Sequence, residues 1–491
     1  MSKTHSNLIN GEWVGDAADH FEDLNPADLT EVVAQVPAMS AQEAGDACHG
    51  AALAYDDWSA TSSIDRGDIL LRAANLLRER VKEISSDITR EMGKTLAEST
   101  AEVFGSANFL EYYGSFGRQP WGERLPYRAA GVEAYTRREP LGVVLAISPF
   151  NDPLLTPARK LAPALITGNT VVLKAATDSP LAGMHLAAAL KDAGLPAGVL
   201  NTVTGRASVV GDALLGSTHL AAVSFTGSTA VGQDIAHRLA GRNCRLQTEM
   251  GGKNGALVLA DADLRYAAST IGNAAFAQAG QRCTATSRVV VMDGIFDEFV
   301  EKLEAYATGL TIGDGTAAST QMGPVVNEGH MHDVLRDVKA AVKAHATVVT
   351  GGERLVENGL ERGCFVAPSV LVCPQTSDAL WQEEIFGPVV ALYRAHTEEE
   401  AHAAILDTRY GLSAAVFTNR LDAANRFIER MDTGQVAVNL STAGWDVHLP
   451  FGGFRESGSA FKEQGQQALT FYTRVKTVAM RHHVAPQGPL L

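Results

Sequence analysis

The chain has 491 residues, too many for one ordinary domain, and suggests two or three. Its 41 basic and 56 acidic side chains give a net charge of −15, which argues against general nucleic-acid binding because that needs a basic surface. The five cysteines are scattered without a CxxC pair, so we expect neither a metal site nor a disulfide framework. The opening residues MSKTHSNLINGEW lack an apolar signal core, and no run approaches the roughly 18 apolar residues that span a bilayer; we therefore expect a cytoplasmic protein without a membrane segment.

The first 120 residues are predicted to be mainly helical, with an amphipathic stretch over 66–92. Two further segments, 124–140 and the tail 470–485, alternate polar and apolar residues without forming a compact unit. This pattern favours exposed strands that pair with another subunit, because bare strand edges need covering. Ordinary surface hairpins are the alternative interpretation.

Between 141 and 250, short β-branched runs alternate with helical segments, which indicates βαβ units around a parallel sheet. In chain order the predicted strands are 141–147, 170–174, 198–203, 221–225 and 245–249. Asp152 is interpreted as the N-cap of the first intervening helix, and Gly168 as its C-terminal stop. A second segment of the same kind begins near Gly251, with predicted strands at 256–260, 287–292, 389–394 and 414–419. The fold class is therefore α/β.

The segment FTGSTAVG (225–232) lies between a predicted strand and a predicted helix. Gly227 lets the backbone turn tightly there, and the free N–H groups of a helix N-terminus suit a pyrophosphate. Only part of the GxGxxG fingerprint is present, so this segment alone is weak evidence for dinucleotide binding.

Three residues that can carry chemistry stand at predicted strand or helix ends: Glu249 in EMGGKN, Cys283 in GQRCTATSR and Asn151 in SPFND. Singly, each has an ordinary structural explanation, as a solvated carboxylate, a small buried thiol and a turn amide. Together they suit one reaction. A thiolate adds to an aldehyde carbonyl, hydrogen-bond donors meet the resulting oxyanion, and a carboxylate activates water to release the acid from the thioester.

In their local strings, these residues make the chain similar to the aldehyde dehydrogenase superfamily over nearly its whole length. The strings that carry the resemblance, in the family's order, are INGEW (9–13), NPAD (25–28), EMGK (91–94), LGVVLAISPFN (141–151), KLAPALITGNTVVLK (160–174), FTGS (225–228), EMGGKN (249–254), GQRC (280–283), MGPVV (322–326), EEIFGPV (383–389), YGLSAAVF (410–417) and PFGGFRESG (450–458). The resemblance implies a Rossmann-type dinucleotide-binding domain (1–123 and 145–250), an α/β catalytic domain (251–457) and a β oligomerisation arm (124–144 and 470–485). It also implies NAD or NADP as the cofactor and a homodimer or homotetramer.

The resemblance assigns Cys283 as the nucleophile, Glu249 as the general base, and Asn151 with the Cys283 backbone N–H as the oxyanion hole. Relatives that pass the acyl group to coenzyme A typically lack this base, so Glu249 favours hydrolysis to the carboxylic acid. Glu463 matches a second acidic position and is interpreted as a proton relay or a solvated surface residue. The implied cofactor-binding residues are Ile147, Ser148, Phe150, Lys174, Thr177, Gly227, Ser228, Gly251, Glu384 and Phe386.

One departure from the family pattern concerns the cofactor. The family string is often KPxExTP, whereas this chain has KAATDSP, with Thr177 where an acid commonly grips the adenosine ribose. An acid there would repel a 2′-phosphate, so its loss makes NADP acceptable, although the adjacent Asp178 partly restores the charge. The choice between NAD and NADP stays open.

A second departure concerns the substrate. Arg159 matches the position where succinic semialdehyde dehydrogenases carry an arginine for the substrate carboxylate, although pairing with a local acid would also explain it. A second arginine of those enzymes is replaced by Ala277. The strings around Cys283 and STAGWDVHLPFGG look more like the 2-oxoglutarate semialdehyde dehydrogenase branch, with Trp445 and His448 predicted at the tunnel mouth.

These features predict oxidation of a short anionic aldehyde: 2-oxoglutarate semialdehyde first, then succinic semialdehyde or an aldehyde bearing a phosphonate or sulfonate. One alternative is a benzaldehyde or vanillin type of dehydrogenase, with Trp445 and Phe150 stacking on the ring. The other is a non-catalytic relative, which the presence of Cys283, Glu249 and Asn151 disfavours.

Overall fold

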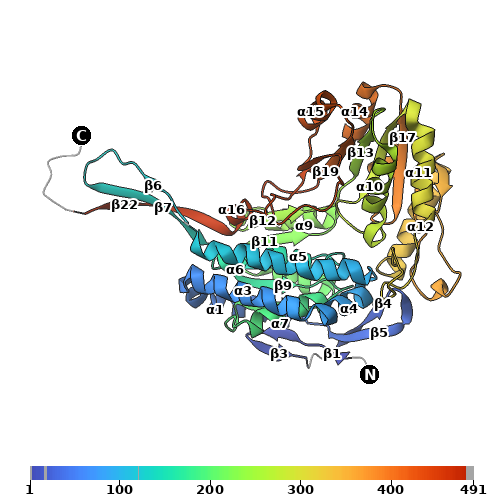
Figure 1. Ribbon diagram of the computed structural model, residues 1–491. Helices are drawn as coiled ribbons and strands as arrows, with labels where there is room; N and C mark the ends of the chain where they lie inside the picture. The colour runs from blue at the N-terminus through green and yellow to red at the C-terminus, as the bar shows by residue number, and fades with distance from the viewer. Residues whose placement is uncertain (1–2, 16–18, 120, 483–491) are drawn as a thin grey trace.

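The computed structural model describes residues 3–15, 19–119 and 121–482. The fold class is α/β, as the sequence predicts, with two largely parallel sheets flanked by helices and a long ribbon that leaves the body (Figure 1). Within these ranges no helix has the length and apolar character needed to cross a membrane.

The first parallel sheet has the order β10-β9-β8-β11-β12, and all its neighbours run parallel. Its strand order therefore reverses between β8 and β11, which is where an open α/β sheet forms a crevice at the carboxyl ends of its strands. The strands are β8 (Val143–Ile147), β9 (Thr170–Lys174), β10 (Leu200–Val203), β11 (Leu220–Thr226) and β12 (Arg245–Glu249). The helices between them are α6 (Leu155–Ile166), α7 (Leu181–Asp192), α8 (Ala207–Gly216) and α9 (Thr229–Leu239).

Burial on both faces explains why β8 reads as a continuous apolar run. Val144 and Ala146 belong to the core shared with α5 (Leu96–Ser115) and α6, while Val143 and Leu145 belong to the core shared with α1 (Ala41–Leu53) and α8. Successive side chains of a strand point to opposite faces, so a strand covered on both sides needs apolar residues at every position.

The second sheet has seven strands in the order β15-β16-β17-β14-β13-β19-β20, and only β15 runs antiparallel to its neighbour. Its strands are β13 (Asn254–Val258), β14 (Thr286–Met292), β15 (Thr347–Thr350), β16 (Ser369–Val372), β17 (Val389–Ala395), β19 (Ser413–Phe417) and β20 (Gln435–Val438). The main helices packed with it are α10 (Leu264–Phe276), α11 (Phe296–Thr308), α12 (Glu328–Lys343), α14 (Glu398–Leu406) and α15 (Leu421–Arg430). The two sheets thus divide the chain near residue 250, while the predicted domain limits themselves stay a prediction.

The N-terminal region differs in part from the helical prediction, because its first forty residues form strands. These are β1 (Lys3–Thr4), β2 (Asn7–Ile9), β3 (Glu12–Val14), β4 (His20–Asn25) and β5 (Asp28–Pro37). The β2–β3 hairpin closes over Asn10 and Gly11, whose φ angles of 49° and 83° suit a two-residue turn. Helices follow only from residue 41: α1, α2 (Tyr55–Ala60), α3 (Ser63–Glu79), α4 (Val81–Met92) and α5.

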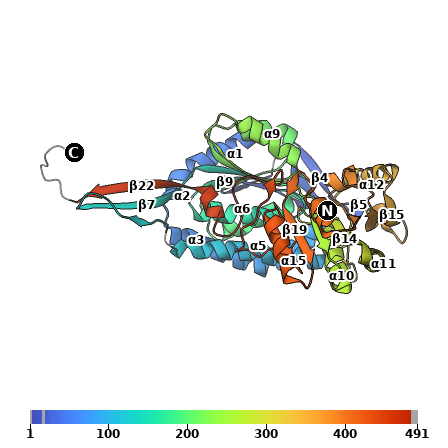
Figure 2. The same ribbon diagram turned by 90° about the horizontal axis from the view of Figure 1, so that it is seen from above.

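The ribbon is a three-stranded sheet made of β6 (Arg124–Leu125), β7 (Val132–Pro140) and β22 (Thr473–Arg481), which follows α16 (Ala468–Tyr472). β7 and β22 pair antiparallel along their whole lengths, so the two segments predicted as strands are partners within one chain. Figures 1 and 2 show the ribbon projecting away from the body in both views. Residues 483–485 of the predicted arm lie outside the described part of the chain.

Candidate active site

A cavity of about 580 Å³ lies at the carboxyl ends of β8, β9, β11 and β12, at the crevice that the strand order creates. Residues from the second half of the chain, including the nucleophile loop and α12, close its other side. All three predicted catalytic residues and all ten predicted cofactor residues line it, namely Ile147, Ser148, Phe150, Asn151, Lys174, Thr177, Gly227, Ser228, Glu249, Gly251, Cys283, Glu384 and Phe386. Their separate positions in the sequence therefore converge on one site.

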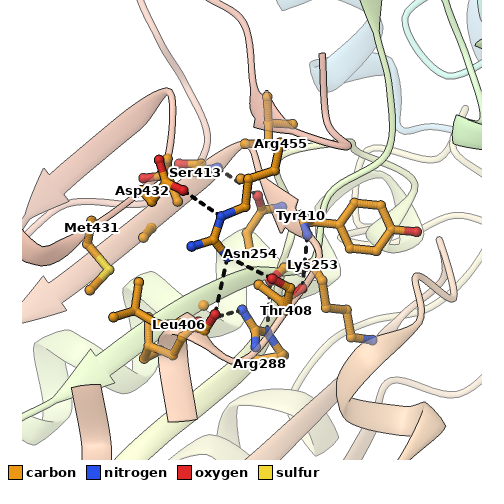
Figure 3. A pocket seen from close by; sticks show the side chains of 16 residues that line it. Lys253, Asn254, Arg288, Leu406, Thr408, Tyr410, Ser413, Met431, Asp432 and Arg455 are labelled. Atoms are coloured by element: carbon orange, nitrogen blue, oxygen red, sulfur yellow. Dashed lines mark hydrogen bonds and ion pairs between the residues drawn. The ribbon is translucent and has the colours of Figure 1, made fainter. Parts of the chain in front are cut away.

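The side-chain amide of Asn254 holds the loop that carries Cys283. Asn254 Nδ2 donates to the carbonyl oxygens of Cys283 (2.7 Å) and Ala285 (2.9 Å), and Asn254 Oδ1 accepts from Ser413 N (3.0 Å). Figure 3 shows Asn254 beside Lys253, and both residues line a small cavity. Because all these bonds reach backbone groups, Asn254 fixes the loop without touching the thiol.

The Cys283 thiol lies in a desolvated setting. Burial raises its pKa to about 12, and the nearby positive charge of Arg159 acts in the opposite direction. The thiol is therefore protonated at neutral pH in the free enzyme, so formation of the thiolate needs a base.

Glu249 is the carboxylate in this cavity that has no partner. It is 3% exposed, and neither of its carboxylate oxygens accepts a hydrogen bond from another described residue. Burial, followed by the negative charge of Glu463, raises its pKa well above the usual value, while Lys160 and Arg159 lower it. A buried carboxylate with both oxygens free and a raised pKa suits proton transfer near neutral pH.

Glu463 is completely buried, which excludes the solvated-surface interpretation. It forms ion pairs with Lys160 and with Arg159, whose Nη1 lies 3.2 Å from Glu463 Oε2. Burial alone would raise the pKa of Glu463, but Lys160 and then Arg159 outweigh it and hold the pKa below its usual value. Glu463 is therefore ionised, and its role as a proton relay stays a prediction.

Asn151 follows β8 and is 4% exposed in the same cavity. Among the described residues, none accepts a hydrogen bond from its side-chain amide. A buried amide with free donors can stabilise a developing oxyanion, so the setting suits the predicted role.

The part of the cavity predicted to hold the adenosine contains Lys174 and Thr177. Burial lowers the Lys174 pKa to about 8, and its Nζ donates to Ala175 O (2.8 Å) and Thr177 Oγ1 (3.2 Å). Asp178 also lines the cavity and is exposed there, where its Oδ1 accepts from Asn327. This region therefore contains one cation and an acid displaced by one residue from the position that the family usually uses.

Two glycines of the cavity leave no space for a side chain, because neighbouring side chains approach their backbones closely. A β-carbon on Gly227 would lie 2.6 Å from Phe225 Cζ, and one on Gly251 would lie 2.1 Å from Glu384 Oε2. The φ angle of Gly227 is not in the left-handed region, so the tight turn expected from the sequence does not require glycine here. Glycine is needed because the Phe225 ring approaches the backbone closely. The N-terminus of α9 after Ser228 has no side-chain cap, which leaves its N–H groups for a pyrophosphate. These residues fit a dinucleotide.

The part of the cavity predicted to hold the nicotinamide is lined by aromatic rings. The rings of Phe150 and Phe386 lie 5.8 Å apart edge to face, and His330 contacts both at 6.0 and 6.2 Å. Phe386 has a φ of 55°, and its carbonyl oxygen lies 2.8 Å from His330 Nε2. Glu384 Oε1 accepts from Gly252 N (3.0 Å), and burial raises the Glu384 pKa to about 7.

Sequence reasoning missed the contribution of α12 to this cavity. The residues of α12 that line it are His330, Asp333, Arg336 and Asp337. In the sequence they look like the polar face of an ordinary amphipathic helix, and only the position of MGPVV just before them pointed to this region. They add polar groups at the rim of the cavity.

The N-cap prediction for Asp152 is wrong. Helix α6 begins at Leu155, and Glu102 Oε1 accepts from the N–H groups of Leu154 (2.8 Å) and Leu155 (3.0 Å). Asp152 instead accepts from Lys94 Nζ at 3.1 Å. A buried lysine without acidic partners is strongly destabilising, so Asp152 pairs with Lys94. The N-terminus of α6 loses no cap, because Glu102 supplies it from α5.

A second cavity of about 490 Å³ shares Asp152 with the first as a lining residue. Phe109, Arg282 and Trp445 also line this second cavity, which we call the entrance cavity. Arg159 lies deeper, with Cys283, between the rings of Phe109 and Phe451.

The structure does not bring His448 to either cavity. Its side chain is exposed, and its Nδ1 lies 3.6 Å from Asp446. Among the described residues, no group of three or more His, Cys, Asp or Glu side chains could hold a metal ion.

Three features are typical of a dinucleotide-dependent α/β enzyme. They are the crevice of the parallel sheet, the close approach at Gly227 and Gly251, and the uncapped N-terminus of α9. The chain belongs to the aldehyde dehydrogenase family, whose model matches residues 13–478. It is therefore an NAD(P)-dependent aldehyde dehydrogenase.

Two curated relatives are named for one substrate. The chain is 39% identical over 479 residues to the alpha-ketoglutaric semialdehyde dehydrogenase of Bacillus subtilis, covering 97% of this chain and 98% of the relative. It is 40% identical over 480 residues to the alpha-ketoglutarate semialdehyde dehydrogenase of Haloferax volcanii, with 97% and 99% covered. The crystal structure of betaine aldehyde dehydrogenase from Staphylococcus aureus in complex with NAD+ matches with a TM-score of 0.95 at 31% identity, covering 99% of this chain and 95% of that chain.

Proposed function

We propose that this enzyme oxidises a short anionic aldehyde to its carboxylic acid through a thioester on Cys283, with 2-oxoglutarate semialdehyde as the first candidate substrate. The observation that carries the chemistry is the convergence of Cys283, Glu249 and Asn151 on one buried cavity. Succinic semialdehyde and aldehydes with a phosphonate or sulfonate belong to the same substrate class.

In the proposed reaction, Cys283 Sγ attacks the aldehyde carbon and the thiol proton passes to solvent. Asn151 Nδ2 and the Cys283 backbone N–H donate hydrogen bonds to the oxygen that becomes negative, and one such donor is worth about 3 kcal/mol. When bound, NAD or NADP supplies the hydride acceptor, and the acyl group remains as a thioester on Cys283. Glu249 then removes a proton from water, which attacks the thioester and releases the acid.

Lys174, Thr177, Gly227 and Ser228 would hold the adenosine and pyrophosphate parts of the cofactor. Ile147, Ser148, Phe150, Gly251, Glu384 and Phe386 would hold the nicotinamide end. The close approach at Gly227 and Gly251 and the uncapped N-terminus of α9 support this division. Glu463, paired with Lys160 and Arg159, would carry protons between Glu249 and the surface.

Two observations support an anionic substrate. The relatives cited above are named for alpha-ketoglutarate semialdehyde, and Arg159 lies in the cavity that contains Cys283. The aromatic alternative finds some support in Trp445 and Phe109 lining the entrance cavity. Arg159 shares its charge with Glu463, so its effect on substrate has to be separated from its effect on that pair.

An assay at 340 nm with a panel of aldehydes and both cofactors tests the proposal. We expect the highest kcat/KM for acidic aldehydes, and we expect Arg159→Ala to raise KM strongly for them with little change for benzaldehyde. Arg159→Lys, which keeps a charge beside Glu463, is the control. Equal kcat/KM values of the wild-type enzyme for acidic and aromatic aldehydes would contradict the substrate class, equal small effects of Arg159→Ala on both would contradict substrate binding by Arg159, and no reduced cofactor with any aldehyde would contradict the reaction.

For assembly, we propose a homodimer or homotetramer joined through the ribbon of β6, β7 and β22. β22 is an edge strand whose outward side chains are mostly exposed, including Val475 at 57% and Met480 at 43%. A long edge strand of this kind needs a cover. Light scattering of the full-length chain beside a variant truncated before β22 tests this, since the truncated chain should have a lower mass per particle. The cytoplasmic location stays a prediction.

A further inference from the structure

The entrance cavity contains one basic side chain among the described residues that line it, Arg282, which directly precedes Cys283. The same cavity is bordered by four acids: Glu98, Glu102, Asp152 and Asp446. An anionic aldehyde that reaches the thiol through this cavity would meet repulsion from the acids, so a cation is needed there. Arg282 is in position to supply it.

The neighbouring acids already have donors of their own. Glu98 accepts from the N–H groups of Thr95 (2.9 Å) and Gln278 (2.8 Å), and Glu102 accepts from Lys94 (2.7 Å) as well as from α6. These bonds engage the carboxylates of Glu98 and Glu102 without using Arg282. The guanidinium group of Arg282 therefore forms no ion pair with a described acid, whereas that of Arg159 pairs with Glu463.

Gln278 holds Arg282 in one orientation. Arg282 Nε donates to Gln278 Oε1 (2.6 Å), and Gln278 Nε2 donates to Asp152 Oδ1 (3.0 Å). Gln278 itself sits in a left-handed backbone with φ of 53°, fixed by the Glu98 bond to its N–H. The two terminal nitrogens of Arg282 have no hydrogen-bond partner among the described residues, so both remain as a parallel pair of donors.

Asp152 connects this arrangement to the reacting centre. Burial would raise its pKa, but Lys94 and then Arg282 hold it below the usual value, so the Arg282 charge is close to Asp152. Asp152 lines both the entrance cavity and the cavity of Cys283. Phe109 and Trp445 form the apolar part of the entrance wall, and the Trp445 indole is fixed by its bond to Thr442 O (3.0 Å).

We infer that Arg282 is a specificity-determining residue that binds the distal carboxylate of the substrate through its two terminal nitrogens. A short carbon chain then spans the distance between this anchor and Cys283, with its methylene groups against Phe109 and Trp445. Gln278 is a positioning residue, because it orients the guanidinium before the substrate arrives and so reduces the entropic cost of binding. This inference rests on the proposed anionic substrate class.

The test compares three aldehydes of different charge in the full-length enzyme: succinic semialdehyde, its neutral methyl ester, and betaine aldehyde. The variant is Arg282→Met, which keeps much of the side-chain length without the charge. The matched control is Arg265→Met, which removes one positive charge from an exposed position on α10.

We expect Arg282→Met to lower the acid-to-ester ratio of kcat/KM by about 10- to 100-fold, mainly through KM of the acid, because bonds to charged groups contribute in this range. The ester should be unchanged, and betaine aldehyde should be unchanged or better. Arg265→Met should behave as wild type. The inhibition constant of succinate should weaken in parallel with the acid substrate.

Equal losses on acid and ester would assign Arg282 to the loop structure alone and overturn the inference, as would an unchanged ratio. Arg282→Lys gives a second measurement if the methionine variant does not fold. It should show an intermediate ratio, because an ammonium group cannot bind a carboxylate through two fixed donors, and a wild-type ratio would overturn the bidentate contact. If the wild-type enzyme itself does not prefer the acid over the ester, the proposed substrate class fails; if it does and Arg282→Met keeps that preference, only the role of Arg282 fails.

Discussion

Replacing Gly251 by alanine tests how the nicotinamide end of the site is built. A β-carbon at this position would lie 2.1 Å from Glu384 Oε2 and 2.8 Å from Glu384 Cδ, so the carboxylate must move away. That movement breaks the bond from Gly252 N to Glu384 Oε1 (3.0 Å) and withdraws a group that we propose to hold the nicotinamide end of the cofactor. A hydrogen bond to a charged group contributes about 1.5–3 kcal/mol, so we expect KM for NAD or NADP to rise about tenfold to a hundredfold.

Gly211→Ala is the matched control for that change. Gly211 lies within α8, and nothing stands within 4 Å of the β-carbon it would gain. We expect wild-type kinetics and slightly higher thermal stability, because alanine favours a helix by up to about 1 kcal/mol over glycine.

A double-mutant cycle decides whether Gly251 acts through Glu384. Glu384→Gln alone should raise the cofactor KM, and Gly251→Ala added to it should have little further effect. Steady-state kinetics with a saturating aldehyde and varied cofactor measure all four proteins. Fully additive effects, or a Gly251→Ala enzyme with an unchanged cofactor KM, would refute the reasoning.

Three further outcomes are expected. Because desolvation raises the Cys283 pKa to about 12, inactivation of the free enzyme by iodoacetamide should keep accelerating with pH up to pH 10, and a plateau below pH 9 would contradict the raised pKa. Thr177→Glu should raise the preference for NAD over NADP, because a carboxylate there repels a 2′-phosphate; an unchanged cofactor ratio would place the adenosine elsewhere. Lys94→Met should lower the melting temperature markedly, since removing one member of a buried ion pair such as Lys94–Glu102 costs about 3–5 kcal/mol, and an unchanged melting curve would argue against that pair.

The parallel sheets and the main site could be predicted from the sequence because their signals are local. Strands buried on both faces, such as β8, need continuous apolar runs, and these stand out in the chain. The residues at the strand ends stand in specific strings, so Asn151 and Glu249 could be singled out before their spatial relation was known. The structure adds that these ends meet at one crevice.

The features that sequence reasoning missed depend on long-range pairing. Glu102, and not Asp152, caps α6, while Lys94 in the loop between α4 and α5 pairs with both carboxylates. Nothing in the sequence near Asp152 indicates that pairing. His330 contacts Phe150 and Phe386 only because α12 packs across the crevice, and an isolated amphipathic helix gives no sign of such contacts.

The arm prediction was right about strands but incomplete about their partner. The alternation in 124–140 and 470–485 signals strands with one open side, and β7 and β22 pair with each other inside one chain. Alternation alone does not say which strand covers which edge. Among the described strands β22 is the longer of the two edge strands of this sheet, and its cover by a second subunit stays a proposal.

The central claim, a covalent acyl intermediate on Cys283 that Glu249 hydrolyses, is tested most directly by trapping it. Glu249→Gln should lose about 10²- to 10⁴-fold in turnover, so acid-quenched enzyme incubated with cofactor and an acidic aldehyde should accumulate the acyl group. Mass spectrometry of the peptides should find that acyl mass on Cys283 and nowhere on Cys48, Cys244, Cys364 or Cys373. The account would be contradicted if Cys283 is unmodified after each active site has reduced one cofactor molecule. An acyl group on another residue would also contradict it.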